Sequence, residues 1–121
     1  MILFLTKDLM VQSNASAAAR KSGIQMRSVS SIDDAIKFLQ SEPVSQLLID
    51  LQTPGLAIDD VLQKLQSFKS KLVMYAFAQH VEEELLSAAK DGLFKAVLTR
   101  GQFVTRLPQI VAEAANSAVG E

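Results

Sequence analysis

Hydrophobic and polar positions alternate between two kinds of segment along the chain. Residues 2–6 form a short, nearly unbroken apolar run, and residues 44–51 contain the run Leu47-Leu48-Ile49, the pattern of strands covered on both faces. Residues 72–78 and 94–98 repeat that pattern later in the sequence. Residues 24–29 instead alternate apolar and polar positions with period two, which predicts a half-exposed strand at the edge of a sheet. The pattern therefore predicts five strands.

A segment of helical character follows each predicted strand. The first helix, residues 9–22, is rich in alanine and ends at Gly23, a residue that commonly terminates helices. Apolar residues recur at helical spacing in the later segments, which predicts helices over residues 32–39, 58–68, 82–90 and 103–114. Pro108 lies inside the last of these, so that helix should begin late or kink there.

Five strand–helix units with short connections predict one architecture. The expected fold is α/β, a single doubly wound five-stranded parallel sheet with helices on both faces. The sequence contains no repeat or linker, so residues 1–121 are expected to form one domain. Open parallel sheets bind ligands at the C-terminal ends of their strands. The residues expected there are Lys7, Asp8, Asp50, Phe77, Ala78, Thr99 and Arg100.

The composition excludes several kinds of chemistry. The absence of cysteine rules out a disulfide framework and a thiolate nucleophile, and the single histidine, His80, rules out a histidine cluster around a metal. A net charge of −1 gives no broad attraction to nucleic acid or to an anionic membrane. No signal peptide or membrane span is evident, so we expect a cytoplasmic protein.

Several features together resemble the response-regulator receiver domain of two-component signalling. They are the order of the strands and helices, Asp50 at the end of the third strand, Pro54 four residues later, and the segment 88–92 before the last strand. The resemblance covers essentially the whole chain and implies the flavodoxin-like receiver fold. It also implies that Asp50 is the phosphoacceptor position. In the family, two acids after the first strand join this aspartate to hold Mg²⁺, and a hydroxyl and a lysine contact the phosphoryl group.

This sequence departs from that family pattern at most of the supporting positions. The acidic pair falls on Thr6 and Lys7 or on Lys7 and Asp8, so at most one acid remains. Phe77 stands at the hydroxyl position, and Thr99 stands at the lysine position. The resemblance therefore implies a degenerate phosphate pocket.

The residues of this pocket allow specific expectations. Asp8 and Asp50 could bind Mg²⁺ weakly, but we expect no metal, because a Lys7–Asp50 ion pair would replace it and hold the domain in one state. Phe77 should pack on the rim and fill the space of the missing phosphate. Asp8 also suits the N-cap of the first helix, and Lys7 the solvated surface. Arg100 would point to the opposite face if it continued the last strand.

The expected function is that of a stand-alone pseudo-receiver in phosphorelay signalling, without enzymatic activity. It would bind a histidine kinase, a downstream signalling protein or a second copy of itself, through the face that the resemblance assigns to residues 82–114. The apolar residues expected on that face are Leu85, Ala89, Val97, Phe103, Leu107 and Val111. One alternative is a working Mg²⁺-dependent phosphoacceptor at Asp50. The other is a binder of nucleotides or small molecules at the rim.

Overall fold

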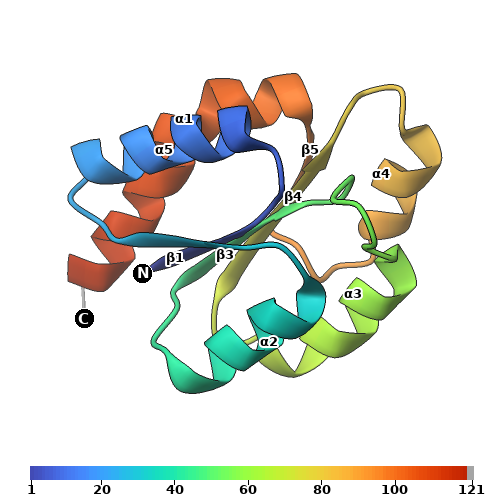
Figure 1. Ribbon diagram of the computed structural model, residues 1–121, viewed down its shortest axis with the longest axis horizontal. Helices are drawn as coiled ribbons and strands as arrows, with labels where there is room; N and C mark the ends of the chain where they lie inside the picture. Colours follow the sequence, from blue (N-terminus) through green and yellow to red (C-terminus); the bar gives the residue numbers. More distant parts are fainter. Residues whose placement is uncertain (120–121) are drawn as a thin grey trace.

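The computed structural model describes residues 1–119 and the side chains of residues 1–116. Five parallel strands form one sheet in the order β2-β1-β3-β4-β5, which confirms the predicted doubly wound architecture (Figure 1). The strands are β1 (Ile2–Leu5), β2 (Met26–Val29), β3 (Gln46–Asp50), β4 (Val73–Ala78) and β5 (Ala96–Thr99). The last strand thus begins two residues later than its apolar run, because Phe94 packs into the core from the preceding connection.

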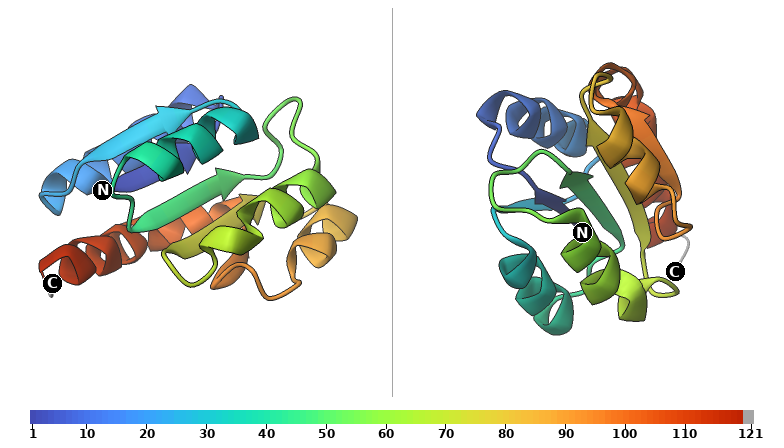
Figure 2. Two further views of the ribbon diagram at one scale, coloured as in Figure 1. Left: turned by 90° about the horizontal axis from the view of Figure 1, so that it is seen from below. Right: turned by 90° about the vertical axis from the view of Figure 1, so that its right-hand side faces the viewer.

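Helices cover both faces of the sheet. They are α1 (Leu9–Lys21), α2 (Ile32–Ser41), α3 (Ile58–Leu65), α4 (Glu83–Ala89) and α5 (Arg100–Val119), with a 3-10 turn η1 (Gln66–Phe68) after α3. Helices α1 and α5 lie side by side on one face, whereas α2, α3 and α4 cover the other (Figures 1 and 2). Each face has its own hydrophobic core cluster. In the described part of the chain, no helix is both long and apolar enough to cross a membrane.

Burial of the strands follows their place in the sheet. All residues of β1 and β3 are buried, because helices cover both faces of these central strands. Strand β2 forms one edge, and none of its residues is fully buried. This difference confirms the contrast between the unbroken and the alternating apolar patterns of the sequence.

Side-chain caps fix the beginnings of two helices. The Oδ1 atom of Asp8 accepts hydrogen bonds from the backbone N–H groups of Met10 at 3.0 Å and Val11 at 3.2 Å. The Ser31 hydroxyl accepts one from the N–H of Asp34 at 3.1 Å. These side chains satisfy N–H groups that have no partner within the helix. The Asp8 cap confirms a prediction from the sequence.

Helix α5 begins earlier than predicted, directly after β5. Thr99 and Gln102 form a capping box: the Gln102 side chain accepts from the Thr99 N–H at 3.0 Å, and the Thr99 hydroxyl accepts from the Gln102 N–H at 3.2 Å. The helix then continues past Pro108, so the expectation of a late start is wrong. Pro108 lies on the exposed side of the helix, where a missing backbone hydrogen bond can be replaced by solvent.

Candidate functional site

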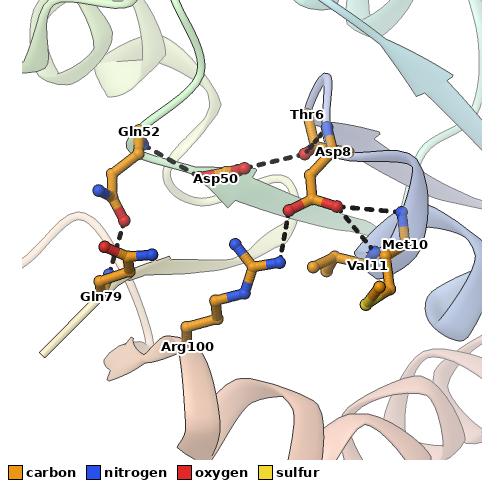
Figure 3. Close-up of polar contacts among 8 residues, drawn as sticks. All are labelled: Thr6, Asp8, Met10, Val11, Asp50, Gln52, Gln79 and Arg100. Carbon is orange, nitrogen blue, oxygen red and sulfur yellow. Dashed lines mark hydrogen bonds and ion pairs between the residues drawn. The ribbon is translucent and has the colours of Figure 1, made fainter.

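The ends of β1 and β3 bring two polar side chains together. Leu5 and Ile49 are paired in the parallel register, so the next residues, Thr6 and Asp50, are also neighbours. Because side chains alternate along a strand, both point toward the face covered by α1 and α5. The Thr6 hydroxyl donates a hydrogen bond of 2.9 Å to Oδ2 of Asp50 (Figure 3). Thr6 therefore contacts the candidate phosphoacceptor directly.

Asp50 is held by its own turn as well as by Thr6. Its side chain is almost entirely buried, and Oδ1 accepts the backbone N–H of Gln52 at 3.0 Å. The carbonyl oxygen of Asp50 accepts the hydroxyl of Thr53 at 2.7 Å. Both carboxylate oxygens thus already have donors, and Asp50 organises the turn that follows β3.

A second carboxylate at this edge joins the starts of two helices. Asp8 caps α1 with Oδ1, and its Oδ2 accepts a hydrogen bond from Nη2 of Arg100, the first residue of α5 (Figure 3). Partial burial favours the neutral acid, but the Arg100 guanidinium and the N–H groups of Val11 and Met10 outweigh it. The pKa of Asp8 therefore lies below its ordinary value. The ionised carboxylate ties α1 to α5.

The predicted ion pair between Lys7 and Asp50 is wrong. Lys7 is exposed, and the ion pairs found among the described residues do not include it. Thr6 and Lys7 are consecutive and project to opposite sides, so only Thr6 reaches Asp50. Arg100 supplies the cation of this edge instead. Arg100 was expected to point to the opposite face on the assumption that it continued the last strand. That assumption does not hold, because Arg100 is the first residue of α5.

Phe77 lies deeper than the predicted rim position. It is paired with Asp50 in the register of β3 and β4, but its ring is 1% exposed. The ring stacks on Phe103 of α5 with centroids 4.1 Å apart and meets Phe4 edge-on at 6.0 Å. Phe77 is therefore a core residue of the α1/α5 face. It places an aromatic ring where the family resemblance implies a hydroxyl group.

Thr99 lies at the end of β5, as predicted, but its polar groups serve the helix that follows. Its hydroxyl and its N–H both bond to Gln102 in the capping box. The sequence pattern Thr-x-x-Gln is typical of such a capping box, although the apolar periodicity predicts a later helix start. Thr99 thus supplies neither the positive charge nor the free donor that the lysine of the family pattern would supply.

Gln52 is a further residue of this edge that sequence reasoning missed. Its Oε1 accepts the backbone N–H of Gln79 at 2.7 Å, and its Nε2 donates to Glu82 Oε1 at 3.4 Å (Figure 3). Gln52 therefore fastens the turn after β3 to the connection between β4 and α4. Its place two residues after Asp50 is the signal that could have identified it.

The residues at this edge do not fit a Mg²⁺ site. Mg²⁺ prefers six oxygen ligands in near-ideal octahedral geometry. All four carboxylate oxygens of Asp8 and Asp50 accept hydrogen bonds from the chain itself, and the guanidinium of Arg100 lies against Asp8. Among residues 1–116, whose side chains the structure describes, no three His, Cys, Asp or Glu side chains are grouped closely enough to share a metal ion.

The apolar residues of the expected partner face belong largely to the core. Phe103, Leu107 and Val111 are at most 2% exposed and pack between α5 and the sheet. Ala89, the last residue of α4, is fully buried. These four side chains cannot line a surface for a partner, because the helical periodicity that identified them marks the inward face of each helix.

Solved structures are similar to this chain over nearly its whole length. The signal receiver domain of a putative Luxo repressor protein from Vibrio parahaemolyticus has a TM-score of 0.77 at 17% identity, covering 98% of this chain and 91% of that one. A CheY-like receiver domain protein from Methanospirillum hungatei has a TM-score of 0.78 at 12% identity, covering 98% and 95%.

A third similar structure is the beryllofluoride-activated NtrC4 receiver domain dimer, with a TM-score of 0.78 at 14% identity and 96% of each chain covered. No protein-family model and no curated protein matches the sequence. The strand order, the five covering helices and these similarities agree. The chain has the fold of the response-regulator receiver domains.

Proposed function

We propose that this chain is an atypical receiver module that acts through protein–protein contacts and does not use Asp50 as a Mg²⁺-dependent phosphoacceptor. The observation that supports this proposal is that both carboxylate oxygens of Asp50 already accept hydrogen bonds. One comes from the Thr6 hydroxyl and the other from the backbone N–H of Gln52. Phosphoryl transfer in receivers requires a carboxylate that is free to attack and a divalent cation that neutralises charge. Here the carboxylate is buried and already hydrogen-bonded.

The second carboxylate supports the same proposal. The carboxylate of Asp8 already binds the Arg100 guanidinium and two backbone N–H groups. A divalent cation would have to displace these donors before it could bind there. The neighbouring Phe77 ring adds no hydrogen-bond donor for phosphoryl oxygens. A receiver fold in this arrangement remains in one state, and binding of a partner protein is the function it can still perform.

The test is an amide NMR titration with Mg²⁺ and then with beryllofluoride, a mimic of the phosphoryl group on aspartate. We expect no chemical-shift changes centred on Asp8 or Asp50. Incubation with acetyl phosphate and Mg²⁺ should leave the mass unchanged. Addition of one phosphoryl group that disappears in Asp50→Asn would contradict the proposal and establish the working phosphoacceptor instead.

A matched variant makes a negative result informative. Thr6→Asp with Arg100→Ala restores a second acid beside Asp50 and removes the competing cation. We expect Mg²⁺ to shift the amides of residues 6–8 and 50–52 in this variant but not in the parent chain. Equal responses in both proteins would mean that Thr6 and Arg100 do not block the metal.

A further inference from the structure

One edge of the sheet has backbone groups that face away from it. Strand β2 lies at this edge and, among the strands of residues 1–119, pairs with β1 alone. The Thr6 N–H donates to the Val29 carbonyl at 3.1 Å, so Val29 and, two residues earlier, Arg27 turn their backbone groups toward β1. The N–H and C=O groups of Met26 and Ser28 therefore point outward, as a row to which another strand can bind.

A groove of about 550 Å³ borders this free edge. Helices α1 and α2 cover the two faces of the sheet next to it (Figure 2, right). All three elements contribute to the lining, which includes Gln12, Ser28, Ser30, Asp34, Lys37 and Phe38. An extended chain in this groove would lie between α1 and α2 while its backbone met the outward groups of β2.

The side of the groove toward α1 is polar and uncharged. Met26 packs against the core cluster beneath α1 and α5, so Ser28, two residues later in β2, projects to the same face. Gln12 of α1 also lines the groove. Hydroxyl and amide groups of this kind suit small polar side chains on an added strand.

The side of the groove toward α2 carries an excess of positive charge. The Arg27 guanidinium lies over the Phe38 ring, 5.7 Å from its centroid, and the exposed Lys37 lines the groove. The carboxylate of Asp34 lines the groove as well, whereas the adjacent Asp33 is neutralised by an ion pair with a lysine of α3. Two cations against one free acid favour an acidic side chain on this wall.

We propose that the outer edge of β2 binds an extended segment of another protein as a sixth strand, with an acidic side chain of that segment against Arg27 and Lys37. In such complexes the backbone hydrogen bonds give the affinity and the alternating side chains give the specificity. This inference rests on the proposed function, since it names a surface and a class of partner for a module that acts through protein contacts.

The probe is a synthetic peptide, Thr-Val-Thr-Glu-Thr-Val-Thr, with blocked ends. As a strand of either direction it presents valine and glutamate on one face and threonine on the other. An amide NMR titration with up to about 5 mM peptide should give saturable shifts in residues 26–30. Hydrogen exchange should slow at the outward N–H groups of Met26 and Ser28 but not at that of Arg27. The absence of saturable shifts in these residues overturns the proposal.

Loss of one outward N–H tests the backbone pairing. Ser28→Pro removes this donor and no hydrogen bond to β1, and it should weaken peptide binding at least about tenfold. Ser28→Ala keeps the N–H and is the matched control, and circular dichroism checks that both variants are folded. Two N-methylated peptides, one modified at valine and glutamate and one at threonine, test the same bonds in the unaltered protein. Only one set of N–H groups can face β2, so equal affinities of the two peptides overturn the proposal.

Charge reversal tests the acidic contact. Arg27→Glu should weaken binding of the probe and strengthen binding of a peptide with lysine in place of glutamate. Lys90→Glu is the control, because it makes the same change in net charge at the end of α4, which packs on β4 and β5. Equal effects of the two variants overturn the contact with Arg27. The beryllofluoride titration monitors Asp50 and not β2, so this proposal and the proposed function fail separately.

Discussion

Thr6 and Asp50, 44 positions apart in the sequence, share a buried hydrogen bond of 2.9 Å between the ends of β1 and β3. The Thr6 oxygen also accepts the backbone N–H of Asp8 at 3.0 Å. One hydroxyl therefore links the candidate phosphoacceptor to the start of α1. In the register that places the acidic pair of the family pattern on Thr6 and Lys7, a hydroxyl group therefore stands beside Asp50 where the family pattern has an acid.

Removal of that hydroxyl should destabilise the protein. Thr6→Val leaves a buried Asp50 oxygen without its donor, which should lower the free energy of unfolding by about 1–3 kcal/mol. Thr6→Ser keeps the hydroxyl and serves as the control. Urea denaturation compares the two. A Thr6→Val variant as stable as the parent protein would show that the bond contributes nothing to stability.

Substitutions of Asp8 should separate its two roles. Asp8→Ala loses both the helix cap and the Arg100 ion pair and should lower the free energy of unfolding by about 1–2 kcal/mol. Asp8→Asn keeps a good cap and loses only the ion pair, so we expect a loss below about 1 kcal/mol. Thermal or urea unfolding measures both. If Asn were as damaging as Ala, the ion pair and not the cap would dominate.

The stability of the protein should depend on the ionisation of Asp8. Its pKa is lowered in the folded state, so its contribution is fully present above the ordinary value of 3.8 and is lost as the pH falls through the folded value. Arg100→Ala removes one cause of the shift and should flatten the loss of stability in this acidic range. Urea midpoints measured at a series of pH values provide the test. A parallel pH dependence in parent and variant would contradict it.

Phe77 should be required for stability even though it occupies a functional position of the family pattern. Phe77→Thr supplies the hydroxyl that receivers commonly carry, but it leaves a cavity in place of the ring that stacks on Phe103. It should lower the free energy of unfolding by about 3–5 kcal/mol. Phe77→Leu retains most of the volume and should cost much less. Chemical denaturation distinguishes them. A stable Thr variant would mean that the ring is not needed to fill the core.

Pro108 offers a stabilising substitution. It lies in the interior of α5 and on the exposed side, where proline is less favourable than alanine by up to about 3 kcal/mol. Pro108→Ala should therefore raise the melting temperature. The neighbouring exposed Gln109→Ala is the control and should change the free energy of unfolding by less than about 0.5 kcal/mol. Unchanged stability in Pro108→Ala would show that the helix is already adapted to proline.

The sequence predicts the fold well because local rules and global architecture agree. Unbroken apolar runs mark the central strands, and the alternating run marks β2 at the edge. The caps at Asp8 and Ser31 are recognisable because the hydrogen bonds span only two or three residues. The start of α5 was predicted too late, because its capping box precedes the apolar residues from which the helical periodicity is recognised.

The site was less predictable, since its partners are distant in sequence. Asp50 and Asp8 were identified from strand ends and helix caps, which are local features. The choice of Thr6 over Lys7 as the neighbour of Asp50 depends on which side chain alternation turns inward. The choice of Arg100 as the partner of Asp8 depends on the packing of α1 beside α5.

By itself, the sequence determined the order of strands and helices, the parallel sheet and the position of Asp50, because periodicity and capping act over a few residues. Only the tertiary structure decided that Asp50 is bonded to Thr6 and that Phe77 belongs to the core. Those relationships join residues from different strands and helices. Their free energies depend on distance and burial, which exist only once the chain has folded.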